Sequence, residues 1–515
     1  MKKLALMSGL ALALLLAIPA AAVLAEATVT PIWSGETSLP DFVGAAAKAR
    51  PTADSGVPQD PYLAPNPLGG VHLDAWNSDV ADLAGPLGRA PVVWTSTLAP
   101  PRLSPAVPIG ATQAFDSHGR PVVAYSNAAD AGVVLLDPVT LAVLTSYPLH
   151  TATGNAALGS CYFYVDARDQ VVIADGADQI ITLREAGTEA QPQFEKVAEE
   201  SYDLSSIVPA GDRLGGVIVD WRGRIWFDTR GSVADGVAPG VGVIDPRTWP
   251  DVGWLRLRTG EQISNTIAVT KQAAFVVTSR RMYEIAAGAD AQPHVVWRRA
   301  YQTTGQLKPG QYSLGSGTSP TIFGSGKYVA IADNAEQVHV VVYRTGRLKR
   351  GQTRVVGEPM PVFRNMAGSA VENSLLCMRD SIVVENVYGY AVTKDGTQSP
   401  SLPGFERIDV TRDGRALRKV WVNDDVASTY SPRLSTRTGL VYTESRKVDP
   451  HPGPGTDGYV YYLTALDFRT GKTVWEKRLG AGFNFDGYYP GVEFGLDGTV
   501  YMVVYGGIIA VRDGS

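Results

Sequence analysis

The sequence predicts an all-β protein, an eight-bladed β-propeller whose blades are four-stranded antiparallel sheets. The first observation is a strand centred on a tryptophan, which recurs at Trp94, Trp254, Trp297, Trp421 and Trp475. A repeat of roughly 45 to 55 residues is the length of one four-stranded blade. The second observation is composition: 54 glycines and 34 prolines suit many short strands and turns, and 45% hydrophobic residues are enough for a core.

Eight inner hairpins are the third observation. Each consists of two strands joined by a tight turn, such as DSHGR, DWRGR or GLDGT. The hairpins occupy residues 111–127, 161–178, 215–231, 265–281, 319–336, 373–389, 431–447 and 490–507. One blade for each hairpin gives eight blades.

The two ends of the repeat predict how the ring closes. The last blade lacks an outermost strand, whereas residues 91–98 (PVVWTSTL) form an outer strand without a partner. We expect this N-terminal strand to complete blade 8, which also removes an exposed sheet edge. The propeller is thus predicted over residues 91–515, and a Pro/Gly-rich arm over residues 26–90. We expect the arm to lie over the propeller surface, with a short helix near residues 79–83.

Residues 1–25 predict export. Two lysines precede an apolar run, and small residues follow up to Ala25, as in a cleavable signal peptide. No later apolar run is long enough to span a bilayer. We therefore expect the mature protein in the periplasm or the medium, without a membrane span. The net charge of −5 is slight for 515 residues and argues against nucleic acid as a partner.

Propeller connectivity predicts which residues surround one mouth of the central channel. The loops that lead into the inner strands and those that leave the second strands share one face of the ring, which we call the loop face. The short hairpin turns share the other, the turn face. Polar residues on the first face are candidate ligand contacts. They are Asn155, Asn265, Ser319, Arg364, Tyr430 and Tyr489.

The densest polar group on this face belongs to blades 5 and 6. Hard cations such as Ca²⁺ bind carboxylate and amide oxygens, so calcium is the candidate cofactor. The candidate ligands are Asp333, Asn334, Glu372, Asn373 and Asn386. The alternative is that these side chains only satisfy strand ends and loop amides. If the site is a calcium-dependent lactonase or esterase, Glu385 is the candidate catalytic base.

Ser319 lies in the stretch GSGTSPT, which lacks the strand-to-helix elbow of G-x-S-x-G hydrolases. We interpret this stretch as a tight, Gly-rich loop that brings the backbone close to the channel.

One outer strand keeps the full pattern Ala465, Asp467, Thr470, Gly471, Lys472 and Trp475. In this pattern the chain resembles the quinoprotein-like eight-bladed propellers with PQQ-like repeats, over residues 91–515. LGSGTSPTIFGSGKYVAIADNAE and VENSLLCMRDSIVVENVYGY also look like motifs of secreted propellers without an assigned activity. The resemblance implies the fold and brings a quinone-dependent dehydrogenase to mind. That family holds PQQ partly with adjacent cysteines and a tryptophan platform. This sequence has no adjacent cysteine pair, and its recurring tryptophans lie in outer strands, which argues against PQQ.

Three functions remain open, and the sequence does not decide whether the protein is an enzyme. The one we favour is an exported propeller that binds a small molecule or a partner at the polar channel mouth. The alternatives are the calcium-dependent hydrolase and an assembly scaffold for envelope proteins.

Overall fold

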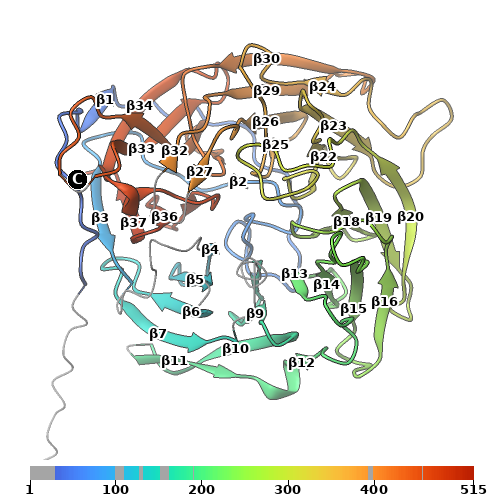
Figure 1. Ribbon diagram of the computed structural model, residues 1–515. Coiled ribbons are helices and arrows are strands. Elements are labelled where there is room, and N and C mark those ends of the chain that lie inside the picture. Colours follow the sequence, from blue (N-terminus) through green and yellow to red (C-terminus); the bar gives the residue numbers. More distant parts are fainter. Residues whose placement is uncertain are drawn as a thin grey trace, which may run out of the picture.

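The computed structural model describes residues 29–98, 110–126, 131–150, 162–189, 191–392, 398–454 and 456–514. Eight antiparallel blades form a ring, which confirms the predicted eight-bladed β-propeller (Figure 1). Among these residues, none forms a helix that is long and apolar enough to cross a bilayer.

Blades 1 to 4 follow the chain, each from its innermost to its outermost strand. Blade 1 contains β4 (Gly110–Phe115), β5 (Pro121–Ser126), β6 (Ala131–Leu136) and β7 (Val143–Pro148). Blade 2 contains β8 (Tyr164–Val165), β9 (Val171–Ala174), β10 (Gln179–Thr188) and β11 (Gln191–Lys196), with η2 (Ala198–Glu200) and β12 (Tyr202–Asp203) after them. Blade 3 contains β13 (Leu214–Val219), β14 (Ile225–Thr229), β15 (Gly240–Ile244) and β16 (Val252–Arg256). Blade 4 contains β17 (Ala268–Val269), β18 (Ala274–Val277), β19 (Arg281–Ala287) and β20 (Pro293–Ala300).

Blades 5 to 8 repeat the plan. Blade 5 contains β21 (Thr321–Phe323), β22 (Tyr328–Ala332), β23 (His339–Arg344) and β24 (Met360–Pro361). Blade 6 contains β25 (Leu376–Met378), β26 (Ser381–Glu385), β29 (Phe405–Val410) and β30 (Leu417–Asn423), with the small hairpin of β27 (Ala391–Val392) and β28 (Gln398–Ser399) inserted. Blade 7 contains β31 (Arg433–Ser435), β32 (Leu440–Val448), β33 (Tyr459–Asp467) and β34 (Thr473–Ala481), followed by η3 (Phe483–Phe485). Blade 8 contains β35 (Glu493–Phe494), β36 (Val500–Val504), β37 (Gly507–Arg512) and the N-terminal β3 (Val92–Ser96).

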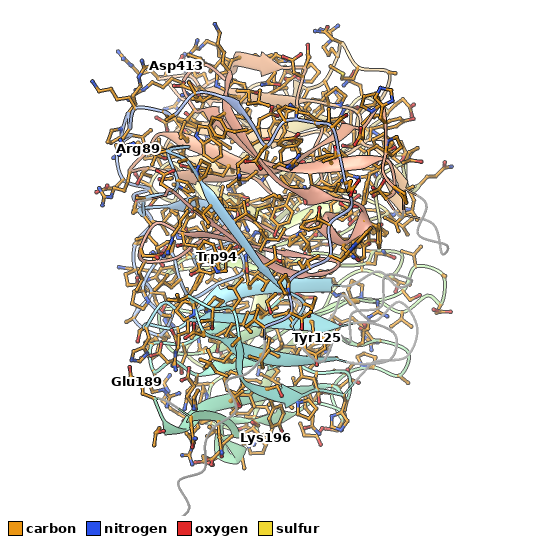
Figure 2. All side chains as sticks on the ribbon, turned by 90° about the vertical axis from the view of Figure 1, so that its left-hand side faces the viewer. Arg89, Trp94, Tyr125, Glu189, Lys196 and Asp413 are labelled. Atoms are coloured by element: carbon orange, nitrogen blue, oxygen red, sulfur yellow. The ribbon has the colours of Figure 1, made fainter. Side chains whose placement is uncertain are left out.

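The N-terminal strand β3 closes the ring, as predicted. It pairs antiparallel with β37, from Val92 opposite Arg512 to Ser96 opposite Ile508. Figure 2 shows β3, with Trp94 labelled, running along the outside of the ring. The first and last parts of the propeller are thus joined by a backbone ladder, and blade 8 has no unpaired outer edge at β37.

The Trp475 hairpin shows why its sequence pattern forms a turn between two outer strands. Asp467 Oδ1 accepts hydrogen bonds from the amides of Arg469 and Thr470, each at 2.9 Å. Gly471 follows with a φ of +72°, which a glycine adopts without strain. The turn places Trp475 opposite Ala465, fully buried, with its ring 6.3 Å from Phe42.

The prediction that the N-terminal arm lies over the propeller surface is incomplete, because part of the arm enters the ring. Residues 42–44 form β1 (Phe42–Gly44), which pairs with β34 on the outer edge of blade 7. The chain then turns inward, and residues 68–81 run inside the ring (Figure 1). The expected helix near residues 79–83 is wrong: Asp79 has a φ of +59°, and Val80–Ala81 form β2, which pairs parallel with β31.

Backbone hydrogen bonds hold the arm in the channel. Carbonyl groups of the arm accept hydrogen bonds of 2.8 to 3.1 Å from amides of six innermost strands. The pairs are Leu68 with Phe115, Gly69 with Val165, Ala75 with Val269, Trp76 with Ile322, Ser78 with Cys377, and Asp79 with Leu434. Residues 59–63 reach the turn face, where the Trp221 indole donates to the Gln59 carbonyl. The arm therefore fills the channel from the turn face.

Two tryptophans of the arm test whether it is an integral part of the fold. Trp76 is 6% exposed and belongs to the core shared with blades 2 to 5, whereas Trp33 is 57% exposed. We expect Trp76→Ala to lower the free energy of unfolding by about 3 to 5 kcal/mol, because it leaves a cavity among packed side chains. Trp33→Ala, the matched control, should change it by less than about 1 kcal/mol. Urea unfolding of both variants gives the comparison, and equal small effects would show that the arm is only loosely docked.

Candidate functional site

The loop face of the channel is crossed by the segment between blades 4 and 5. We call residues 301–317 the covering loop. Its Lys308 ammonium donates to the Ala335 carbonyl at 2.8 Å, its Gln311 amide donates to the Val371 carbonyl at 2.9 Å, and its Gly310 carbonyl accepts a 2.9 Å hydrogen bond from the Tyr489 hydroxyl. These partners belong to blades 5, 6 and 8. The covering loop thus spans the side opposite the turn face.

Two of the predicted residues meet beneath this face. The Asn373 side-chain amide donates to Glu385 Oε2 at 3.1 Å and to the Thr429 carbonyl at 3.0 Å. Asn373 precedes the innermost strand of blade 6, and Glu385 ends the second strand, so the blade connectivity brings them together. Both side chains are buried.

Arg446 of β32 extends this network into blade 7. Its Nη2 donates to Thr429 Oγ1 at 2.6 Å and to Asp486 Oδ1 at 3.1 Å. The guanidinium carbon lies 4.7 Å from the ring centre of Tyr390 and 5.7 Å from that of Tyr461. The Tyr390 hydroxyl donates to Asp486 Oδ2 at 2.9 Å. We call Asn373, Glu385, Thr429, Arg446 and Asp486 the mouth network.

Burial raises the pKa of three glutamate side chains in and near the mouth network. Burial raises the pKa of Glu385 to about 8, although the adjacent Ser428, Asn373 and Arg446 side chains oppose the shift. Burial raises the pKa of Glu372 to about 7, and its Oε1 accepts a 2.6 Å hydrogen bond from Ser313 of the covering loop. The pKa of Glu444 lies well above its usual range because of burial and the nearby Asp486 carboxylate. At neutral pH Glu385 is therefore mainly protonated, and Asp486 forms an ion pair with Arg446 at 3.1 Å.

Several buried polar atoms of this region have no hydrogen-bond partner among the described residues. Three are acceptor atoms: Glu372 Oε2, Asn373 Oδ1 and Glu385 Oε1. Two are donors, Arg446 Nε and Nη1. Leaving one such group unpaired costs about 1 to 3 kcal/mol. The network therefore offers both kinds of polar group to a bound molecule.

The other predicted metal ligands are not gathered here. Asp333 accepts hydrogen bonds from the amide and the ring Nδ1 of His339, and the Asn334 side-chain amide donates to the Gln306 carbonyl. The Asn386 side chain accepts from the Ala370 amide and donates to the Gly368 carbonyl, both in the segment that leads into the innermost strand of blade 6. Within the described part of the chain, no three His, Cys, Asp or Glu side chains are grouped so that they could hold a metal ion. Calcium binding stays a prediction from the sequence.

The predicted ligand contacts have separate environments. The Asn265 amide donates to the Ser316 carbonyl, the buried Tyr430 hydroxyl donates to the Val503 carbonyl, and Tyr489 supports the covering loop. Arg364 is exposed. Ser319 lies against His72 of the arm. Asn155 is outside the described residues.

Sequence reasoning missed Asp486 and His72. Asp486 lies in the loop that leads into the innermost strand of blade 8, so the rule that selected Tyr489 could have selected it too. No signal pointed to His72, because the arm has no repeat that predicts its path into the channel.

Two surface cavities lie elsewhere. One, of about 520 Å³, is on the turn face between blades 4 and 5 and is lined by Trp76, Phe275 and Glu284 among others. The second, of about 810 Å³, is an open depression beside Trp94 and Asp41. Neither is lined by a residue of the mouth network.

Comparisons with known proteins support the fold alone. No family model matches the chain. An uncharacterised protein of Archaeoglobus fulgidus is 23% identical over 326 residues, which cover 58% of this chain and 61% of that protein. Quinohemoprotein alcohol dehydrogenase from Comamonas testosteroni is similar in structure, with a TM-score of 0.50 and 12% identity over 89% of this chain and 81% of that one. Sqt1 of Chaetomium thermophilum, bound to the N-terminus of ribosomal protein L10, gives a TM-score of 0.44 at 12% identity over 76% of this chain and 93% of that one. At such low identity, a likeness in structure shows the fold and no function.

The raised pKa of Glu385 predicts a pH dependence of stability. The folded state keeps a proton on this carboxyl up to about pH 8, whereas an ordinary glutamate loses it near 4.5. Its contribution to stability is therefore complete below about pH 4.5 and is lost as the pH rises toward 8. Glu385→Gln should reduce the fall in unfolding free energy by up to about 1.4 kcal/mol per pH unit between about pH 5 and 7.5. Urea unfolding across this range measures the slope, with Glu358→Gln at an exposed position as the control. Identical slopes for wild type and Glu385→Gln would contradict the buried, protonated carboxyl.

Proposed function

We propose that this protein is an exported β-propeller that binds a small, hydroxyl-rich molecule in the mouth network beneath the covering loop. The carrying observation is the set of buried, unpaired acceptors and donors on Asn373, Glu385 and Arg446. The export part rests on the signal-like sequence of residues 1–25.

A hydroxyl group suits these atoms because it can donate and accept a hydrogen bond at once. It can donate to Asn373 Oδ1 and accept from Arg446 Nε or Nη1. The carboxyl of Glu385 can also do either while it is protonated. A neutral ligand leaves the Arg446–Asp486 ion pair undisturbed, whereas a second anion would compete with Asp486 for the guanidinium.

Aromatic rings surround the polar groups on one side. Tyr390 lies 5.5 Å from Tyr489 and 6.1 Å from Tyr488, measured between ring centres, and Tyr312 of the covering loop packs on both Tyr488 and Tyr489. An apolar wall with a few convergent polar atoms is typical of small-molecule sites. The C–H faces of a sugar ring would fit such a wall. The arm below and the covering loop above favour a small ligand over a protein segment.

A panel of neutral mono- and disaccharides tests this proposal by thermal shift. A sugar at about 100 times its dissociation constant stabilises the protein by about 2.7 kcal/mol. We expect Arg446→Lys, which keeps the charge for Asp486 but removes the unpaired guanidinium donors, to weaken binding of such a sugar by about tenfold or more.

Arg256→Lys makes the same chemical change at an exposed position on the outer strand β16 and should leave the affinity unchanged. The proposal fails if no sugar of the panel raises the melting temperature of the wild type, or if both lysine variants bind equally well.

A further inference from the structure

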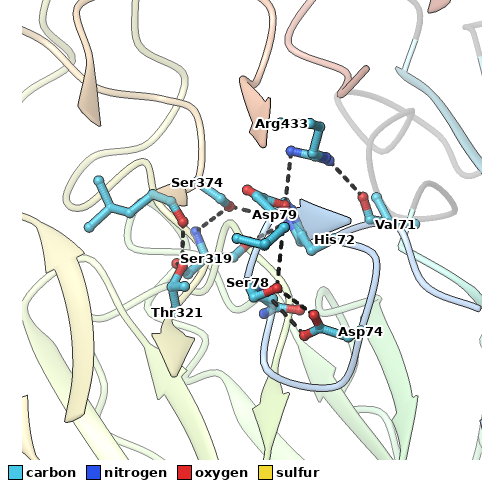
Figure 3. A network of polar contacts seen from close by, with 12 residues as sticks. Val71, His72, Asp74, Ser78, Asp79, Ser319, Thr321, Ser374 and Arg433 are labelled. Atoms are coloured by element: carbon cyan, nitrogen blue, oxygen red, sulfur yellow. Dashed lines mark hydrogen bonds and ion pairs between the residues drawn. The ribbon is translucent and has the colours of Figure 1, made fainter. Parts of the chain in front are cut away.

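A second polar network lies where the arm meets blades 5 and 6. His72 Nδ1 is 3.0 Å from Asp79 Oδ1, and His72 Nε2 is 3.1 Å from Ser319 Oγ. Figure 3 shows His72 and Asp79 on the arm and Ser319 on the neighbouring blade loop. The three residues are less than 8% exposed. Serine, histidine and aspartate are thus linked in the order that nucleophilic hydrolases use.

Arg433 fixes the direction of these hydrogen bonds. Its Nη1 lies 2.9 Å from Asp79 Oδ1, and its Nη2 donates to the Val71 carbonyl. A carboxylate paired with a guanidinium accepts hydrogen bonds and does not donate them. With Asp79 as the acceptor, Nδ1 of His72 is the ring nitrogen that donates. Nε2 is left as an acceptor that faces the Ser319 hydroxyl, which is the tautomer required of a general base.

The surroundings orient the histidine and the serine further. The His72 ring stacks on Tyr162 with 6.2 Å between ring centres. The Ser319 amide donates to Ser374 Oγ at 3.3 Å, and Ser374 Oγ is itself 3.3 Å from His72 Nε2. The shorter distance and the position directly after the Gly-rich stretch single out Ser319.

We propose that Ser319 is a nucleophile toward small esters, with His72 as its general base and Asp79 as the residue that orients His72. Ser319 Oγ attacks the acyl carbon while its proton passes to His72 Nε2. The C–O bond to the alcohol then breaks, and the alcohol leaves with that proton. Water, activated by the same nitrogen, hydrolyses the acyl-serine and releases the acid. The step needs no other reactant, and it does not rest on the proposed sugar site.

The arm therefore supplies both the base and its orienting carboxylate, and the ring supplies the nucleophile. Ser319 is 1% exposed, so an ester reaches it only when neighbouring groups move. The covering loop ends just before Ser319, and its Gly310 has a φ of +89°. Lifting this loop uncovers the serine from the loop face.

A dialkyl fluorophosphonate tests the proposal on the full chain. Attack by Ser319 forms a P–O bond and expels fluoride, while the serine proton passes to His72. Intact mass and peptide mapping should show one adduct, on Ser319. Ser319→Ala should abolish it, and His72→Gln should slow it by about a hundredfold or more.

Ser435→Ala is the matched control, because Ser435 is equally buried and contacts the arm at the Leu83 carbonyl but no histidine. It should react like the wild type. Melting temperatures establish that each variant is folded. An unlabelled, folded wild type, or an adduct that maps to Ser374 or another residue, would overturn the assignment; so would labelling that is insensitive to His72→Gln.

Discussion

Hydrogen bonds between the arm and the innermost strands are the constraint on which the rest of this structure depends. The innermost strand of a propeller blade has one unpaired edge, and in a channel that edge is cut off from most solvent. Here the carbonyls between Leu68 and Asp79 satisfy amides of six innermost strands. The arm thereby serves these amides as a hydrogen-bond partner along the channel axis. The arm also lies beneath the polar groups of the loop face.

Both polar networks follow from this packing. A channel that was open at both ends would hydrate Glu385 and Arg446, whereas the filled channel buries them and raises the pKa of the carboxyl. The same burial makes each unpaired oxygen or nitrogen costly, so the mouth network is poised for a polar partner. Near the arm, an ion pair and two hydrogen bonds link Arg433, Asp79, His72 and Ser319 in a chain that ends at the serine hydroxyl.

The sequence repeat allowed the blades to be predicted, whereas the path of the arm could not be predicted because the arm has no repeat. Tryptophan spacing and turn residues predicted eight blades and the closing strand β3, because each feature is local or periodic. The rule for loop positions correctly brought Asn373 to Glu385. It did not bring Asp333 and Asn386 to this pair, because a side chain at a strand end can bind nearby backbone amides instead, as Asp333 does at His339 and Asn386 at Ala370 and Tyr388. Ser319 begins a repeated hairpin, but His72 lies far away in the arm, which has no periodicity, so no pattern could pair them.

The position of the arm also orders the events of folding. Residues 68–96 are made early, yet their partners include β31 and β37, which are among the last strands to be synthesised. Closing such long loops costs entropy before the contacts compensate for it. Strands β2 and β3 cannot form these contacts until blades 7 and 8 have been synthesised. The N-terminal segment and the last two blades therefore complete the ring together.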